Sequence, residues 1–201
     1  MTESTDLLEV LRRTAATLAD CNQPWALVGG LAVSVRSEPR FTRDVDLAVA
    51  VADDTAAETL VARFQAAGFR LHLTLEHQAL ERLAAVRLSP PAQPAGGIVV
   101  DLLFASSGIE SEICRDAEWL EIAAGLTVPV SQAGHLVATK LLAIAPDRPQ
   151  DGIDLHALVA NLTVADCERA RVAVARIEAL GANRSKRLGE DLERWLQARN
   201  R

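Results

Sequence analysis

Two aspartates inside an apolar run constrain most strongly what this chain can fold into. Asp44 and Asp46 alternate with hydrophobic residues in DVDLAVAV, and Asp101 lies within a second apolar run, IVVDLLFA. Buried strands rarely hold carboxylates without a partner, because an uncompensated buried charge is very costly. Residues i and i+2 of a strand point to the same face. We therefore expect Asp44 and Asp46 to project together, and a neighbouring strand to bring Asp101 to the same place.

A cluster of three carboxylates suits divalent cations. Magnesium prefers oxygen ligands and shares them with substrate phosphates, and two such ions can promote an in-line displacement. The pair Gly29-Gly30 lies just upstream of the aspartates. Glycine allows a close approach of backbone, and the helix expected after the pair offers N–H groups to an anion. Asp44, Asp46 and Asp101 are thus candidate metal ligands, and Gly29 and Gly30 are candidate phosphate contacts.

Each of these signals also has a structural interpretation. A GG dipeptide by itself is more often a turn, and an Asp-x-Asp pair by itself is more often strand-end solvation or a helix cap. The sequence contains neither G-x-G-x-x-G nor G-x-x-x-x-G-K-[ST], which argues against a dinucleotide fold or a P-loop. The combination of the glycines with three aspartates favours the metal site over coincidence.

Hydrophobic periodicity divides the chain into an α/β part at residues 1–130 and a helical part at residues 131–201. Strands are expected near residues 25–28, 44–51, 69–73, 84–88, 98–105 and 126–130. Helices are expected before the helical part near residues 7–18, 31–37 and 55–67. Residues 74–83 fit either a strand or a helix. The segment SPPAQPAGG at 89–97 predicts a loop that joins two strands as a hairpin, with Asp101 on the second arm.

Composition narrows the function classes. The 201 residues, 49% hydrophobic and 24% charged, indicate one globular domain or a core with a small appendage. A net charge of −6 argues against coating of long duplexes, but leaves room for a local basic surface that grips one end of a nucleic acid. No apolar stretch is long enough to span a membrane, and the acidic N-terminus does not resemble a secretory signal. Three widely spaced cysteines favour a reducing cytoplasm.

Basic residues are nearly all arginine. Lys140, in the apolar segment HLVATKLLAI, is one of only two lysines. It either snorkels from an amphipathic helix or serves a site. Three arginines near the aspartates are candidates for holding an acceptor's phosphates, or else form a solvated loop face: Arg36, Arg40 and Arg43. Three basic residues near the C-terminus predict a solvated helix face: Arg184, Lys186 and Arg187.

Together these motifs resemble the signature of the polymerase-β-type nucleotidyltransferases. The order is Gly29-Gly30, thirteen residues, Asp44-Val45-Asp46 and a later strand with Asp101. RFTRDVDL resembles the R-x-T-x-D-x-D form of the minimal and AbiEii-like members. Lys140, followed by RPQD and Asp154, is similar to the K…R-x-K-D-x-x-D block of AbiEii-type toxins, with Gln150 in place of the block's lysine. The resemblance covers about residues 25–160.

The resemblance implies a small mixed sheet flanked by helices, an α/β (α+β) fold whose C-terminal helical part closes a cleft. It also implies metal-dependent transfer of a nucleoside monophosphate from an NTP to an acceptor. The implied catalytic residues are Asp44, Asp46, Asp101, Lys140 and Asp154, with Asp154 orienting Lys140 or another group. The implied nucleotide-binding residues are Gly29, Gly30, Lys140 and Arg148. Two Mg²⁺ ions, or Mn²⁺, would bind to the three aspartates.

Three functions remain in competition. Some relatives with this layout are toxins that add nucleotides to tRNA 3′ ends and are paired with an antitoxin, so an RNA acceptor, above all tRNA, is the leading expectation. The second is transfer to a hydroxyl of a protein or of a small molecule such as an antibiotic. The third is a non-catalytic nucleotide-binding or partner-binding module, against which the intact set of aspartates weighs.

Overall fold

The computed structural model describes residues 3–91 and 97–199. Seven strands form one mixed sheet in the order β3-β4-β5-β2-β1-β7-β6. Their bounds are β1 Trp25–Leu27, β2 Asp44–Val49, β3 Arg70–His77, β4 Arg82–Ser89, β5 Val99–Leu103, β6 Glu118–Ala123 and β7 Leu126–Val130. The β2–β5 and β1–β7 pairs are parallel and the remaining pairs are antiparallel. The predicted mixed α/β fold is confirmed.

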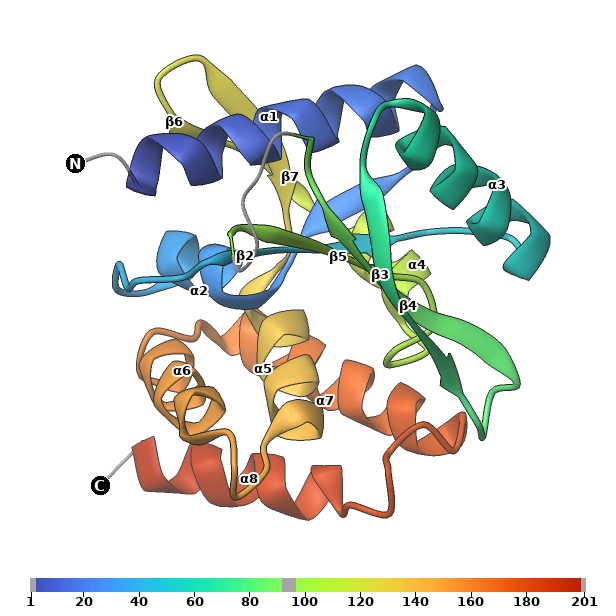
Figure 1. Cartoon of the computed structure of the whole chain (residues 1–201). Helices are drawn as coiled ribbons and strands as arrows, with labels where there is room; N and C mark the ends of the chain where they lie inside the picture. The colour runs from blue at the N-terminus through green and yellow to red at the C-terminus, as the bar shows by residue number, and fades with distance from the viewer. Residues whose placement is uncertain (1–2, 92–96, 200–201) are drawn as a thin grey trace.

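Helices lie on both sides of this sheet. Figure 1 shows α1 and α3 on one side and α5 to α8 gathered on the other. The bounds are α1 Glu3–Asp20, α2 Gly29–Arg36, α3 Asp54–Ala66, α4 Glu110–Arg115, α5 Ala133–Ala143, α6 Pro149–Ala160, α7 Val164–Ala179 and α8 Leu188–Arg199. The change from sheet to helices therefore falls after Val130, where the sequence pattern places it.

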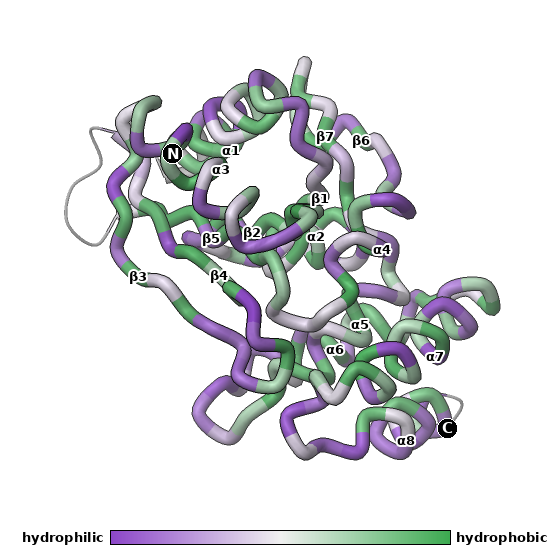
Figure 2. Tube along the Cα trace, turned by 90° about the vertical axis from the view of Figure 1, so that its right-hand side faces the viewer, coloured by the Kyte–Doolittle hydropathy of each residue, from purple (hydrophilic) through white to green (hydrophobic). Residues whose placement is uncertain are grey.

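One hydrophobic core connects the sheet to helices on both sides. It includes Leu11 of α1, Leu47 and Leu102 of the central strands, and Ile177 of α7, each fully shielded or nearly so. Figure 2 shows the hydrophobic stretches running through the middle of the molecule, along the central strands. Burying apolar surface is the main stabilising term in folding, so this core sets the relation between the sheet and the helices.

The ambiguous stretch at residues 74–83 forms the end of one strand, a turn and the start of the next. Strand β3 continues to His77, and β4 begins at Arg82. β3 is the edge strand and is exposed along most of its length. It contains the strand predicted near residues 69–73 and extends it to His77. β4 and β5 pair as the predicted antiparallel neighbours. Residues 92–96 of the predicted loop between them lie outside the described residues.

Two elements have no counterpart among the expectations. Strand β6, EWLEIA, pairs with β7 at the opposite edge of the sheet, and α4 is a short helix after β5. Both are brief and half-exposed, so neither shows a clear hydrophobic period. Within the part of the chain that the structure describes, no helix is long and apolar enough to cross a bilayer.

Candidate active site

One row of side chains crosses four strands on the face of the sheet that looks toward α5. Asp46 of β2 is in register with Asp101 of β5, Asp101 with Arg87 of β4, and Arg87 with Leu73 of β3. All four line the same cleft. Asp44 lies two residues before Asp46 on the same strand and therefore on the same face. The structure thus brings the three predicted aspartates together.

Two of these carboxylates, those of Asp44 and Asp46, have raised pKa values. Burial raises the pKa of Asp46 to about 7, with the charges of Asp101 and Asp44 adding to the effect. Lys140 and the Gly30 N–H, which donates to the Asp46 carboxylate, act in the opposite direction. The pKa of Asp44 is also raised, by burial and then by Asp101. Negative charge is therefore concentrated at this end of the cleft beyond what the surrounding side chains compensate.

Gly29 is required by the position of Asp46. Its φ is +61°, a conformation that glycine adopts without the strain of a side chain. A Cβ built on Gly29 would lie 1.9 Å from Asp46 Oδ2. Gly29 lines the cleft, whereas a Cβ on Gly30 would meet Arg40 and Thr42 instead. The two predicted phosphate contacts thus have different surroundings: only Gly29 adjoins the cleft, and Gly30 offers its N–H to Asp46.

Gly29→Ala is expected to remove activity and to lower the melting temperature. The substitution combines left-handed strain of about 1–2 kcal/mol with a collision that displaces the Asp46 carboxylate. Gly125→Ala is the matched control, because Gly125 has φ +66° and a Cβ added there would meet no atom within 4 Å. Thermal unfolding of both variants separates the strain from the collision. Equal losses in the two variants would show that the contact with Asp46 is unimportant.

Arg87 is a site residue that the sequence reasoning missed. Its Nε donates to Asp101 Oδ1 at 2.8 Å and its Nη2 to Asp101 Oδ2 at 2.6 Å. Both carboxylate oxygens of Asp101 are therefore occupied by one guanidinium. Among the described residues, no three His, Cys, Asp or Glu side chains are arranged as a ready metal site. The alternation of residues along β4 shows which face Arg87 points to. It identifies Arg87 as the partner of Asp101 only once the β4–β5 register is known.

A second charged cluster forms the opposite wall. Lys140 Nζ of α5 lies 2.7 Å from Asp151 Oδ1 and 2.8 Å from Asp154 Oδ2, both on α6. Asp154 is fully buried and also accepts from Arg40 at 2.8 Å and from Gln150 at 2.9 Å. Burial alone would raise the pKa of Asp154, but these donors outweigh burial and lower it. Asp154 thus lies behind Lys140 and holds it, whereas Lys140 and Asp151 line the cleft.

Residues of two connecting segments complete this wall. Arg148 precedes α6, lines the cleft and lies 3.3 Å from Asp151. Arg184, between α7 and α8, also lines the cleft. Lys186 donates to the carbonyls of residues 141, 142 and 144 at the end of α5, at 2.5–3.2 Å. The prediction of a solvated helix face is therefore wrong for Lys186, because the segment between α7 and α8 folds back onto α5. Arg184 is exposed as predicted, although it lies in this segment and not on a helix. Arg187 is exposed as predicted.

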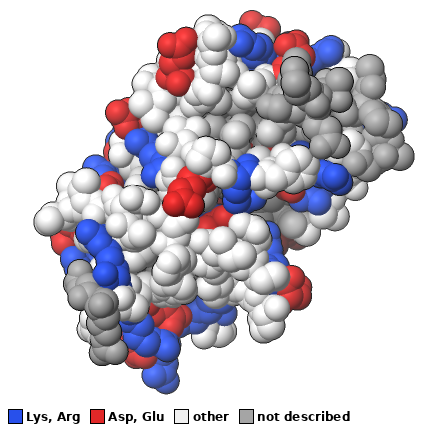
Figure 3. Space-filling view, turned by 90° about the vertical axis from the view of Figure 1, so that its left-hand side faces the viewer, with Lys and Arg blue, Asp and Glu red and all other residues white. Residues whose placement is uncertain are grey.

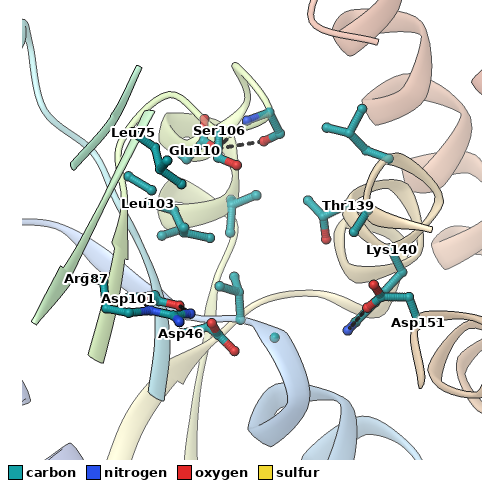
Figure 4. A pocket seen from close by; sticks show the side chains of 18 of the residues that line it. Asp46, Leu75, Arg87, Asp101, Leu103, Ser106, Glu110, Thr139, Lys140 and Asp151 are labelled. Atoms are coloured by element: carbon teal, nitrogen blue, oxygen red, sulfur yellow. Dashed lines mark hydrogen bonds and ion pairs between the residues drawn. The ribbon is translucent and has the colours of Figure 1, made fainter. Parts of the chain in front are cut away.

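Figure 4 shows the two walls facing each other, with Arg87, Asp101 and Asp46 on the sheet side and Lys140 and Asp151 on the helical side. The cleft encloses about 380 Å³, within the size range of small-ligand sites. Its lower end in this view is charged, Leu103 and Thr139 lie along its middle, and Leu75 and Glu110 lie at its upper end. An arrangement of clustered carboxylates opposite an amine can hold cations on one wall and phosphate on the other.

A family model shows which family the chain belongs to. The family described as nucleotidyl transferase AbiEii toxin of a type IV toxin–antitoxin system matches residues 10–200. The chain belongs to this family. It is a nucleotidyltransferase, as the resemblance of its motifs predicts, and the family places it with toxins of toxin–antitoxin systems. No curated protein sequence matches the chain.

Solved structures add the fold. The antibiotic-resistance factor ANT(2'')-Ia, in its solution structure, has a TM-score of 0.56 and 16% identity, over 90% of this chain and 95% of that one. JHP933 from Helicobacter pylori has a TM-score of 0.49 and 15% identity, over 100% and 91% of the two chains. The nucleotidyltransferase toxin MenT4 from Mycobacterium tuberculosis H37Rv has a TM-score of 0.36 and 15% identity, over 98% and 94%. Of these three, only the first exceeds 0.5, and at its identity it shows the fold alone.

Proposed function

We propose that this AbiEii-family protein transfers a nucleoside monophosphate from an NTP to an RNA acceptor, with a tRNA 3′ end as the expected acceptor. The proposal depends on one observation above all: Asp46 and Asp101 are in register on adjacent parallel strands and share a cleft with Lys140. Membership of a toxin family supports nucleic acid as the target and an antitoxin as a partner. We further propose that the protein acts in the cytoplasm.

The donor set fits divalent metal ions. Asp44, Asp46 and Asp101 supply the hard oxygen ligands that Mg²⁺ or Mn²⁺ prefers. Burial, and then the charges of Asp101 and Asp44, raise the pKa of Asp46, and a cation would compensate this negative charge. Asp101 can act as a ligand once Arg87 releases at least one of its oxygens. Bound ions would polarise the phosphoryl group and activate the attacking hydroxyl.

Other residues of the cleft bind the nucleotide or hold the binding residues in position. Gly29 leaves space for the Asp46 carboxylate and for phosphate beside it. Lys140 contacts the triphosphate as a point charge, with Arg148 beside it at the cleft. Asp154 is a positioning residue, because it is buried and holds Lys140 and Arg40. In this proposal residues 1–130 form the nucleotidyltransferase core and residues 131–201 form the helical region that closes the cleft.

The surface is compatible with a small contact on RNA. On the face shown in Figure 3, blue and red side chains are interspersed among the described residues, without one dominating sign. Affinity for long duplexes depends on many phosphate contacts, which a chain of net charge −6 is poorly suited to make. Recognition of a single RNA end needs far fewer.

Incubation with each labelled NTP, Mg²⁺ and total tRNA tests the proposal. Label is expected on RNA with the wild type and not with Asp46→Ala. Loss of signal in the variant excludes a contaminating transferase. RNA that stays unlabelled with the wild type, or is labelled equally by the variant, would reject the proposed activity.

Transfer to a small-molecule hydroxyl is the second candidate. The fold likeness to ANT(2'')-Ia, an antibiotic-resistance factor, favours it, as do the acidic side chains of the cleft, which suit a polycationic acceptor. The same assay on cell lysate without added tRNA separates the two. Label in the small-molecule or protein fraction would favour this candidate, and tight NTP binding that is independent of Mg²⁺, without transfer, would favour a non-catalytic module.

Arg87→Met is expected to tighten Mn²⁺ binding by about tenfold in the absence of nucleotide. The variant removes a positive charge and frees both oxygens of Asp101, and opposite charges nearby dominate such affinities. Titration calorimetry with Mn²⁺ measures the change. Arg82→Met is the matched control, because Arg82 also lies on β4 and pairs with Asp54 away from the cleft. Weaker binding in Arg87→Met would mean that Arg87 helps to hold the site together.

A further inference from the structure

Glu110, the first residue of α4, has a carboxylate oxygen without a partner at the far end of the cleft from Asp46. The side chain lines the cleft and is only 3% exposed. Its Oε1 accepts from the backbone N–H of Ser107 at 2.7 Å and from the Ser107 hydroxyl at 2.8 Å. Its Oε2 has no hydrogen-bond partner among the described residues. A buried acceptor without a donor is costly, so this oxygen is suited to a donor that a ligand brings.

An apolar row separates Glu110 from the charged row. Ala48, Leu103, Ala85 and Leu75 are in register across the same four strands and line the cleft. They lie two residues from the charged row, after it on β2, β5 and β3 and before it on the antiparallel β4, which is about 7 Å along a strand. Figure 4 shows Leu103 on one side of this part of the cleft and Thr139 on the other, with Leu75 and Glu110 beyond them, away from Asp46. A flat, weakly polar ring fits between such walls.

Arg184 places a donor beside this acceptor. Its Nη2 donates to the carbonyl oxygen and to the hydroxyl of Ser106, at 3.1 and 3.3 Å. Burial and the charge of Arg148 lower the pKa of Arg184, while the charge of Glu110 opposes them. The two side chains are therefore close enough to interact, although no ion pair joins them in the described structure. The end of the cleft thus presents one acceptor and one donor.

We propose that Glu110 selects the nucleobase of the incoming NTP by accepting a hydrogen bond from the amino group at position 6 of adenine or position 4 of cytosine, which favours these bases over guanine and uracil. This inference rests on the proposed function. Adenine and cytosine present an amino donor next to a ring-nitrogen acceptor, which matches Glu110 beside Arg184. Carboxylates accept from the cytosine amino group in nucleic-acid complexes. Uracil and guanine present a carbonyl oxygen at the equivalent position, where one acceptor would face another, the unpartnered Oε2 of Glu110.

Binding of α,β-methylene nucleoside triphosphates with Mg²⁺ tests this selection, because the methylene bridge blocks transfer. The wild type is expected to bind the adenine and cytosine analogues at least about tenfold tighter than the guanine and uracil analogues, since sites built for a hydrogen bond reject partners that cannot make it. Equal affinities for all four analogues would overturn the proposal. Absence of binding by any analogue would overturn it together with the nucleotide site itself.

Glu110→Gln is the decisive variant. The amide oxygen keeps accepting from Ser107, while the amino group replaces Oε2 and turns an acceptor into a donor. The preference is expected to fall by at least about tenfold and to shift toward uracil and guanine. Glu112→Gln, on the same helix but outside this cleft, is expected to keep the wild-type preference. An unchanged preference in Glu110→Gln would overturn the proposal.

One further probe keeps the test independent of how the variant folds. The purine riboside analogue lacks the 6-amino group and is otherwise identical to the adenosine analogue. The wild type is expected to bind it at least about tenfold more weakly, and equal affinity would overturn the proposal. If the predicted selection is found but RNA is not labelled, only the RNA acceptor of the proposed function fails. If RNA is labelled without base selection, only this inference fails.

Discussion

Asp46→Asn is expected to reduce nucleotidyl transfer by about 10³-fold, the scale of losing one central electrostatic contact in an active site. The same variant is expected to melt at a higher temperature than the wild type without metal. Burial, and then the charges of Asp101 and Asp44, raise the pKa of Asp46 to about 7. A shift of the pKa from 3.8 to about 7 corresponds to about 4 kcal/mol at pH 8, so removing the charge is expected to raise the melting temperature by about 8–16 °C in a protein of this size.

The pH dependence gives a second readout for Asp46. Between its unfolded pKa near 3.8 and its folded pKa of about 7, the native state holds a proton that the unfolded chain has lost. Stability of the wild type without metal should therefore fall as pH rises through this window. Asp46→Asn should show a flatter profile. Thermal unfolding from pH 4 to pH 8 measures both, and a melting temperature that drops in the variant at pH 8 would assign Asp46 a structural role.

Asp154→Ala is expected to lower the free energy of unfolding by about 3–5 kcal/mol, the usual cost of breaking a buried charge pair. The fully buried Asp154 carboxylate is shared by Lys140, Arg40 and Gln150. Its loss leaves two cations without their common partner. Denaturant unfolding measures the change, and Glu190→Ala, at an exposed helical pair with Arg187, should stay within about 0.5 kcal/mol.

The pH dependence of Asp154 has the opposite sign from that of Asp46. Its folded pKa is lowered, so its contribution to stability is present above pH 3.8 and is lost as pH falls through the folded value. In activity assays the conservative Asp154→Asn should raise the KM for NTP more than it lowers kcat, because the residue positions Lys140 without touching substrate. A destabilisation of less than about 1 kcal/mol in Asp154→Ala would show that the cluster contributes little to the fold.

Much of the site follows from local pattern. The alternation around Asp46 and the apolar run around Asp101 identify two strands and one shared face, because side-chain direction in a strand depends only on residue parity. The parallel pairing of β2 and β5 puts these two residues opposite each other, and this pairing is a property of the whole sheet. Periodicity does not predict it, whereas the resemblance to a family implies that the three aspartates form one site. The switch to helices after Val130 is likewise visible in the sequence.

The rest depends on long-range packing. Arg87 reaches Asp101 only through the β4–β5 register, which spans the loop between them. Lys186 resembles a solvated residue until the segment before α8 folds back onto α5. Glu110 is one of many glutamates, and only the structure separates its paired oxygen from its unpaired one. These positions carry no distinctive local spacing, so no period or motif could single them out.

Arg40 and Lys140 both pair with the Asp154 carboxylate, and this shared contact couples parts of the molecule that could otherwise move separately. Arg40 belongs to the segment between α2 and β2, which approaches the glycine turn, while Lys140 belongs to α5 and the shared group to α6. The buried Asp154 carboxylate therefore connects the sheet wall of the cleft to its helical wall. A ligand that pulls the Lys140 amine toward itself must also strain the contact between Asp154 and Arg40. Substrate entry and the width of the cleft are therefore linked without a separate hinge.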